Sequence, residues 1–285
     1  MPTEGSIAVL AGSGRLPVEL VDHLDRTGAS FRIMALRGFT DRVLTRRADA
    51  VVDLLDIGRI LGVLQSWRPA MVTLAGAVGR PGPGALLGAS SFLRNRAEIQ
   101  RVFSGGDDRL LRGAVRLLEE HGHRVVGAHE LAPHLLAHPD LRSRTMPNRQ
   151  DEEAIRTGFA LLDALSEFDV GQGAVVEGTR VLAVEGPEGT DSMLRRVARM
   201  RHWPFGRRRC SGVLVKTLKK DQDVRVDMPA VGPRTIREAT RAGLAGIALG
   251  EGATLIVDRA EMLRQADRQN IFVVSVPMTK EAAGG

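Results

Sequence analysis

Short apolar runs alternate with amphipathic segments along the first half of the chain. The runs predict buried strands at Ser6–Ala11, Phe31–Leu36, Ala50–Leu54, Met71–Leu74 and Arg124–Gly127. Between them, apolar residues at helical spacing predict helices over Leu16–Arg26, Ile57–Trp67 and Asp107–His121. Strands that alternate with helices are typical of a mostly parallel sheet with helices on both faces. We therefore expect an α/β domain over residues 1–136.

The pattern changes after residue 136. Residues 137–150 are polar and contain proline, which predicts a linker. Residues 151–285 follow with strands and helices in a less regular order, which predicts a mixed α/β domain. Within it, Asp223–Pro229 alternates polar and apolar positions as a strand does. That strand would place the charged side chains of Asp223, Arg225 and Asp227 on one face.

Composition and charge narrow the class of protein. The chain has 285 residues, of which 43% are hydrophobic and 26% charged, as in folded soluble proteins. Lys and Arg exceed Asp and Glu by 40 − 34 = 6. This excess is local, because Ser192–Lys220 contains seven arginines, three lysines and no acidic residue. With no tyrosine and 4% aromatic residues, few rings are present to stack on bases, so we expect no nucleic-acid partner. A single cysteine, Cys210, fits a cytoplasmic protein.

Two glycine-containing turns in the first half are candidates for binding phosphate. Gly12, Ser13 and Gly14 stand between a strand and a helix, where backbone N–H groups can hold an anion. Gly76 follows the fourth strand, and Arg80 after it can bind a phosphate with its guanidinium group. A tight turn needed only for packing remains the alternative for both. A nicotinamide dinucleotide fits poorly, because Pro17 occupies the third glycine position of the dinucleotide fingerprint.

The second half carries the acidic candidates. Three carboxylates lie between Glu185 and Asp191, and their oxygens, above all those of Glu188 and Asp191, suit Mg²⁺. Alternatively, Thr190 or Asp191 is only the cap of the following helix. Lys216 lies in an apolar strand and needs an anionic partner. The Asp223–Asp227 segment either forms an internal ion pair or binds Mg²⁺ beside a phosphoryl group.

An ordered set of motifs resembles one known family. The motifs include AGSGRLP, LAGAVGRP, GAHEL, AVEGPEGTDSMLRR, GVLVK and QDVRVDMPAVGPRTI, and they run from Ile7 to Val276. They are similar to those of the LpxI-type UDP-2,3-diacylglucosamine pyrophosphatases of bacterial lipid A synthesis. The resemblance implies a Rossmann-like N-terminal domain and a distinct C-terminal domain, with the acidic catalytic motifs in the C-terminal one.

The resemblance also implies a reaction and a set of site residues. The reaction is Mg²⁺- or Mn²⁺-dependent hydrolysis of UDP-2,3-diacylglucosamine to UMP and lipid X, with water attacking the α-phosphorus. The essential aspartate of the family's R-x-D-x-P motif maps onto Asp227, which also serves as a candidate metal ligand. We expect Asp223, Lys216 and Arg225 to take part in catalysis, and Gln222 and Thr190 to bind substrate or phosphate.

The resemblance also implies a homodimer. The basic stretch Ser192–Lys220 and the lipid-linked substrate lead us to expect transient contact with the anionic cytoplasmic face of the inner membrane. A non-enzymatic carrier of nucleotide or lipid, and a nicotinamide-dependent oxidoreductase, are the alternative functions.

Overall fold

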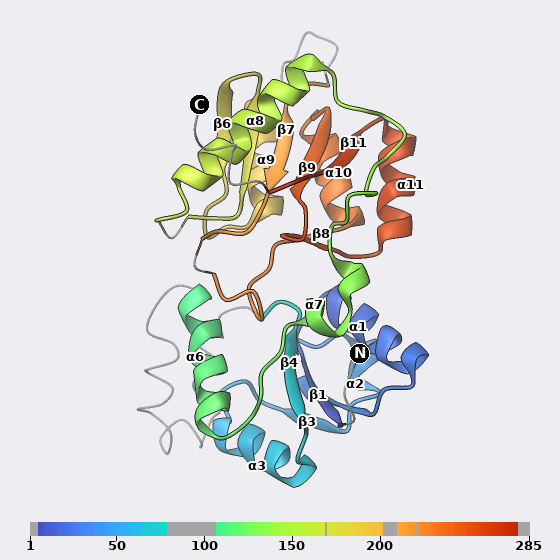
Figure 1. Ribbon diagram of the computed structural model, residues 1–285, viewed down its shortest axis with the longest axis vertical. Coiled ribbons are helices and arrows are strands. Elements are labelled where there is room, and N and C mark those ends of the chain that lie inside the picture. Colours follow the sequence, from blue (N-terminus) through green and yellow to red (C-terminus); the bar gives the residue numbers. More distant parts are fainter. Residues whose placement is uncertain (1–4, 79–106, 169, 202–209, 221, 279–285) are drawn as a thin grey trace. The chain divides into compact units, whose positions relative to one another are not determined.

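The computed structural model describes residues 5–78, 107–168, 170–201, 210–220 and 222–278, which fall into two compact units (Figure 1). Residues 223–227 belong to the first unit together with the chain up to Pro133. The second unit comprises residues 134–222 and 228–285. Each unit is an α/β structure, as expected, with its own sheet and its own buried core.

The first unit is built on a parallel sheet in the order β3-β2-β1-β4. Its strands are β1 (Ile7–Ala11), β2 (Phe31–Leu36), β3 (Ala50–Val52) and β4 (Met71–Ala75). Val125 forms a further parallel bridge to Val72. The helices are listed by their bounds: α1 (Arg15–Thr27), α2 (Arg42–Thr45), α3 (Ile57–Trp67), α6 (Asp107–Glu120) and α7 (Ala128–Leu131).

Alternation along the strands divides the apolar residues of this unit between the two faces of the sheet. Leu10 of β1 and Leu36 of β2 pack in one cluster with Leu64 of α3 and Leu118 of α6. Ile7 points the other way and lies near Leu24 of α1. Helices α3 and α6 therefore cover one face, and α1 covers the opposite face (Figure 1).

The second unit contains a five-stranded mixed sheet in the order β11-β9-β7-β5-β6. The strands β7 (Val213–Lys216), β9 (Gly246–Gly250) and β11 (Phe272–Val276) are parallel, and β5 (Gly173–Glu177) is antiparallel to both β7 and β6 (Arg180–Val184). Helix α8 (Arg149–Ala164) packs on one face. The other face packs against α9 (Thr190–Met200), α10 (Pro233–Arg241) and α11 (Arg259–Gln269).

The apolar runs Ile247–Leu249 and Thr254–Val257, which the sequence pattern predicts as a pair of strands, both contain strands but do not pair with each other. Strand β9, which contains the first run, lies inside the large sheet between β7 and β11. The later segment, β10 (Leu255–Ile256), instead pairs with β8 (Ala230–Val231) in a separate parallel ribbon. Strand length and polarity are alike in both arrangements, so local pattern does not distinguish them.

The expected linker at residues 137–150 is an integral part of the second unit. The Ala137 N–H donates to Thr254 O at 2.8 Å, and the Ser143 N–H donates to Val273 O at 3.0 Å. Leu141 is 1% exposed and belongs to the core that α9, α10 and α11 cover. Asn148 caps α8 by accepting hydrogen bonds from the first-turn N–H groups. Ala137 and Leu141 anchor the segment in this core, and its backbone hydrogen bonds join it to the rest of the unit.

No helix among the described residues is long and apolar enough to cross a membrane.

The packed segment makes a direct prediction about stability. We expect Leu141→Ala to lower the unfolding free energy of the protein by about 2–4 kcal/mol, because a buried leucine would leave a cavity. Met146→Ala is the matched control, since Met146 lies in the same segment but is 57% exposed. Urea unfolding followed by circular dichroism measures both. Equal stability of the two variants would mean that residues 137–150 behave as a linker after all.

Candidate functional site

Two glycine-containing loops lie side by side at the carboxyl end of the first unit's sheet. One loop follows β1 and the other follows β4. Ser13 and Ala77 form an antiparallel bridge, in which each N–H donates to the other residue's carbonyl oxygen at 2.8 and 3.0 Å. The structure therefore brings together four of the predicted phosphate-binding residues, namely Gly12, Ser13, Gly14 and Gly76. Arg80, the fifth predicted there, lies outside the described residues.

The contact between these loops requires glycine at two positions. A Cβ atom on Gly12 would lie 2.7 Å from Ala77 O, and one on Gly76 would lie 2.5 Å from Ser13 O. Gly76 also has a φ of 93°. Because the Gly12 and Ser13 N–H groups donate to carbonyl oxygens of the other loop, they serve the fold. An anion at this edge would instead meet the first turn of α1, whose N-cap Gly14 provides no side-chain cap.

The segment Asp223–Asp227 is a turn of the first unit, so the predicted strand was wrong. The N–H groups of Val226 and Asp227 both donate to Asp223 O, at 3.1 and 3.0 Å. The Asp223 carboxylate also accepts a hydrogen bond from the Arg225 N–H at 3.1 Å. An aspartate that bonds the backbone two residues ahead stabilises a turn against an extended strand. The acidic motif that we assigned to the C-terminal domain thus belongs to the N-terminal unit.

Arg225 is the centre of this turn. Its guanidinium group binds Asp223 in a bidentate manner, with N–O distances of 2.9 and 2.8 Å. The remaining Nη1 binds Glu119 of α6 at 2.5 Å. The hydrogen bonds from Arg225 hold the pKa of Asp223 below its ordinary value, and Asp223 in turn raises the pKa of Arg225. The internal ion pair, one of our two interpretations of this segment, is therefore present.

The turn packs closely against Gly127, the first residue of the GAHEL motif. A Cβ atom on Gly127, which precedes α7, would lie 3.1 Å from the Cα atom of Arg225. The GAHEL motif thus provides the space into which the turn fits. Asp227, the residue that the family motif marks, is half-buried at the end of the turn.

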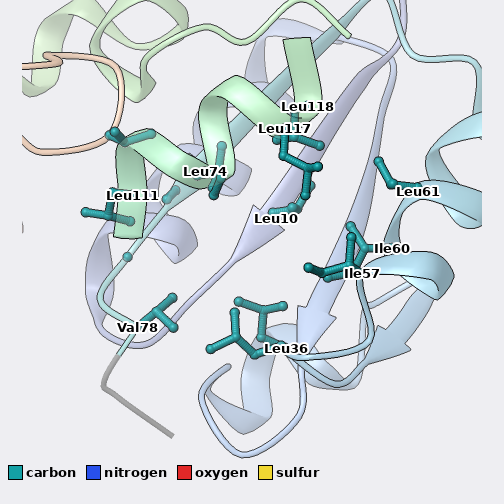
Figure 2. Close-up of a pocket in the computed structure, with 15 residues that line it drawn as sticks. Leu10, Leu36, Ile57, Ile60, Leu61, Leu74, Val78, Leu111, Leu117 and Leu118 are labelled. Atoms are coloured by element: carbon teal, nitrogen blue, oxygen red, sulfur yellow. The ribbon is translucent and has the colours of Figure 1, made fainter. Parts of the chain in front are cut away.

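An apolar hollow opens in the same unit (Figure 2). It is lined by aliphatic side chains and a glycine, with no polar or aromatic side chain among the described lining residues. In Figure 2, Val78 and Leu111 lie toward one end and Ile57 and Ile60 toward the other, with Leu10 between them. Val226, the central apolar residue of the Arg225 turn, also lines the hollow. The acidic turn and the apolar hollow therefore share a wall.

The hollow has a volume of about 90 Å³. Several leucines and isoleucines of the lining also remain partly exposed. An exposed apolar depression of this kind is typical of a binding site.

Lys216 of the second unit lies in a buried polar cluster. Its side chain is 5% exposed and that of Glu185 is 11% exposed, with Nζ and Oε2 3.5 Å apart. Lys216 Nζ donates to Thr190 Oγ1 at 2.5 Å, and this hydroxyl donates to Glu185 Oε1 at 2.7 Å. Glu185 is the anionic partner that we expected Lys216 to need. Its Oε2 atom accepts no hydrogen bond among the described residues.

The other acidic candidates of the second unit are bound to arginines. Glu188 pairs with Arg196 at 2.8 Å, and Asp191 pairs with Arg234 at 2.5 Å. In the part of the chain that the structure describes, no three His, Cys, Asp or Glu side chains lie close enough to hold a metal ion together. Asp227 belongs to the first unit and Glu188 and Asp191 belong to the second, so the proposed metal set stays a prediction.

Gln222 is tied to its own loop. Its Oε1 atom accepts a hydrogen bond from the Lys219 N–H at 3.2 Å, whereas its Nε2 atom is buried and has no partner among the described residues. Gln222 directly precedes the acidic turn in the sequence. Its predicted contact with substrate stays a prediction.

The basic stretch Ser192–Lys220 is less available than its composition suggests. Arg201 donates to Glu177 at 3.0 Å and to three backbone carbonyl oxygens. Lys220 pairs with Asp163 at 2.7 Å. Together with the pairs of Arg196 and Lys216, these contacts show that acids elsewhere in the chain neutralise much of the described part of the stretch.

Sequence reasoning missed Glu119 and the role of Glu185. Glu119 lies on a helix far from the acidic motif along the chain, and nothing local marks it as a partner of Arg225. For Glu185 a signal existed. Gly171 and Gly173 leave room for its side chain, since Cβ atoms there would lie 2.6 and 2.7 Å from it. The two glycines at the start of β5 therefore indicated that another part of the chain comes close there. They did not indicate that this part is Glu185.

Comparison with known proteins gives nearly full-length matches. Residues 6–135 match the LpxI N-terminal domain, and residues 139–274 match the LpxI C-terminal domain. The UDP-2,3-diacylglucosamine pyrophosphatase LpxI of Caulobacter vibrioides is 38% identical over 271 residues, which cover 95% of this chain and 97% of that protein.

Solved structures give much weaker likenesses. The Bordetella bronchiseptica enzyme WbmG in complex with NAD has a TM-score of 0.29 and 14% identity, over 44% of this chain and 37% of that one. A UDP-glucose-4-epimerase from Stenotrophomonas maltophila has a TM-score of 0.28 and 14% identity, over 48% and 40%. At such scores neither carries an argument.

The ion pair of the turn predicts a pH-dependent stability. Because the pKa of Asp223 is lowered on folding, its contribution is present above the unfolded value of about 3.9 and is lost as the pH falls through the folded value. We expect Asp223→Asn to cost about 1–2 kcal/mol at pH 7 and progressively less below pH 4. Denaturant titrations of wild type and variant between pH 7 and pH 3 measure this difference.

Asp53→Asn is the matched control, since Asp53 forms an arginine pair in the same unit that is largely exposed. Such a pair contributes only about 0–1 kcal/mol. A loss at Asp223 that does not shrink with acidity would contradict the role of its charge.

Proposed function

The chain belongs to the LpxI family, and from that premise we propose that it hydrolyses the pyrophosphate of UDP-2,3-diacylglucosamine in lipid A synthesis. The products are UMP and 2,3-diacylglucosamine 1-phosphate, lipid X. The observation that carries this proposal is the 38% identity to the Caulobacter pyrophosphatase across 95% of the chain. A match of that extent includes both units and every motif on which the site was built.

The reaction defines what the residues must do. Water attacks the α-phosphorus, the bond from that phosphorus to the bridging oxygen breaks, and the sugar 1-phosphate leaves. The attacking water loses its protons to solvent, so the products together carry more negative charge than the substrate. Catalysis of such a transfer depends on positioning and on neutralising the charge of the phosphate oxygens.

We assign the water-orienting role to Asp227. Its carboxylate ends the turn that Arg225 pins to α6, and it is half-buried in the first unit. Arg225 holds Asp223 and Glu119, so we assign these two acids and the arginine to positioning Asp227. In this proposal Asp223 keeps the turn in shape and does not contact the reacting atoms.

We assign phosphate binding in the first unit to the first turn of α1, beside the paired glycine loops. The first turn of α1 follows Gly14, and helix N-termini favour anions. In the second unit, Thr190 begins α9 and is held by Lys216 and Glu185. We therefore propose that Lys216 positions Thr190, whose place at the start of a helix suits an anionic group.

A divalent ion in the first unit would share its ligands with the substrate. Mg²⁺ commonly binds one or two protein carboxylates and takes its other ligands from substrate phosphates and water. Asp227, at the end of the turn, would supply such a carboxylate. When bound, Mg²⁺ or Mn²⁺ would neutralise charge on the pyrophosphate oxygens.

The substrate and product imply the remaining partners. Both are acylated, so we propose transient contact with the cytoplasmic face of the inner membrane. A homodimer is likewise part of the proposal, on the family resemblance alone.

The proposal is tested by a hydrolysis assay with identification of the products. With Mg²⁺, the purified protein is expected to release UMP from UDP-2,3-diacylglucosamine, and EDTA is expected to stop the release. Asp227→Asn should lower kcat at least 100-fold, because the variant keeps the size but not the charge of the side chain. Asp53→Asn, an exposed site in the same unit, should retain full activity. Binding of the substrate with no release of UMP would favour a carrier instead.

Isotope labelling tests the position of attack. In H₂¹⁸O, attack at the α-phosphorus places ¹⁸O in UMP, and attack at the β-phosphorus places it in the sugar 1-phosphate. We expect mass spectrometry to find one ¹⁸O atom in UMP and none in lipid X. Label in lipid X would overturn the assignment of the attacked phosphorus and leave the overall hydrolysis intact.

A further inference from the structure

A second cavity of the first unit lies on the face of the sheet opposite the apolar hollow. Ile7 and Met71 line this cavity, whereas Leu10 and Leu74 of the same two strands line the hollow, and residues three apart in a strand point to opposite faces. Helices α1 and α7, which are neighbours in the fold (Figure 1), also contribute to its walls. Its volume is about 350 Å³, within the range of roughly 300–1,000 Å³ that is typical of sites for small molecules.

The cavity lies away from the glycine loops. Ile7 and Met71 are the first residues of β1 and β4, whereas Gly12 and Gly76 directly follow the last residues of these strands. The cavity also contains Thr27, the last residue of α1, and this helix of 13 residues is about 20 Å long. It is therefore separate from the first turn of α1, to which we assign phosphate binding.

The cavity has an apolar wall and a charged one. Leu24, Met71 and Val126 line it with buried side chains. Arg124 and Glu130 also line it and are exposed. A molecule bound there meets apolar surface on one side and two opposite charges on the other. Sites of this composition bind ligands whose apolar part is buried while a few polar groups fix the orientation.

The two charges of the cavity are not used by the fold as an ion pair. Among the described residues, the Arg124 side chain has no hydrogen-bond or ion-pair partner. Glu130 Oε1 accepts a hydrogen bond from the Gly127 N–H at 2.7 Å, and its carboxylate pairs with no arginine or lysine that the structure describes. A cation and an anion that line one cavity without pairing with each other suit a ligand that carries both charges.

His23 adds no third charge to the cavity at neutral pH. Burial of the ring and the nearby Arg26 lower the pKa of His23 from its ordinary value of 6.5, and a hydrogen bond with the Leu131 backbone offsets only part of this effect. The ring is therefore neutral at pH 7. Arg124 and Glu130 then give the lining no net charge, which favours a ligand that is neutral overall.

We propose that this cavity binds an α-amino acid with an apolar side chain, of the size of leucine or methionine. Arg124 binds the carboxylate of the amino acid, and Glu130 binds its ammonium group. The apolar side chain lies on the wall that contains Leu24, Met71 and Val126. A fatty acid would leave Glu130 without a partner, and a phosphate ester would place further negative charge beside it. The site does not depend on the proposed function.

Charge-removing variants give the first test. Arg124→Gln and Glu130→Gln each remove one charge, and glutamine at position 130 can still accept the hydrogen bond from the Gly127 N–H. Arg116→Gln and Glu120→Gln are the matched controls, because both residues are exposed on α6 and do not line the cavity. Thermal unfolding by circular dichroism shows whether each variant folds.

Isothermal titration calorimetry of the full chain with L-leucine measures binding. Each cavity variant should bind leucine at least tenfold more weakly than the wild type, since a hydrogen bond between charged groups is lost. The controls should bind as the wild type does. Absence of leucine binding to the wild type, or an equal loss in the controls, would overturn the proposal.

Ligand analogues test the same charges on the wild-type protein, so this test does not require any variant to fold. 4-Methylpentanoate lacks the ammonium group of leucine, and 3-methylbutylamine lacks its carboxylate. Both should bind at least tenfold more weakly than leucine. If 4-methylpentanoate binds as tightly as leucine, the cavity takes an apolar carboxylate and the assignment of a zwitterion is wrong.

Photocrosslinking identifies the place of binding. Photo-leucine, which carries a diazirine in its side chain, is irradiated with the wild-type protein, and the labelled peptides are identified by mass spectrometry. We expect label on the peptides that contain Leu24, Met71 or Leu131, and we expect excess L-leucine to suppress it. Label that leucine suppresses only at other parts of the chain would assign the amino acid to another site and contradict the proposal.

Discussion

The ion pairs of Arg225 hold together the part of the molecule on which the functional assignment depends. One guanidinium group binds Asp223 within its own turn and Glu119 on α6, two residues more than a hundred positions apart. Because an arginine fork has fixed geometry, these bonds orient the turn as well as attach it. Val226 then contributes to the hollow, and Asp227 ends the turn. Arg225 thus provides a charged link between the turn and helix α6 of the same unit.

Basic side chains also form ion pairs in the second unit, which contains the basic stretch Ser192–Lys220. Lys216 is buried with Glu185, Arg201 binds Glu177, and Lys220 binds Asp163. A buried ammonium group without an anionic partner would be costly, so these acids are a condition of burying the basic residues. Among the described residues, acids from other parts of the chain therefore lie beside several of the basic groups that make up the net charge of +6.

Local pattern was sufficient for most of the elements and insufficient at the candidate site. The predicted strands at Phe31–Leu36 and Met71–Leu74 agree with β2 and β4 closely, since buried parallel strands are continuous apolar runs. The alternation in Asp223–Asp227 was misleading, because a turn stabilised by the Asp223 side chain has the same order of polar and apolar residues as a strand. Likewise, the spacing of Glu188 and Asp191 gave no indication that each pairs with an arginine.

The sequence by itself determined the α/β class, the positions of the main helices and strands, the glycine loops and the family, because periodicity and ordered motifs are properties of neighbouring residues. Only the tertiary structure decided that residues 137–150 are packed, that Arg225 pairs with Glu119, and that Val226 lines an apolar hollow. Each of these depends on contacts between residues far apart in the chain. Such contacts are decided by how complete elements pack, and the identity of a partner more than a hundred residues away leaves no trace in the local pattern.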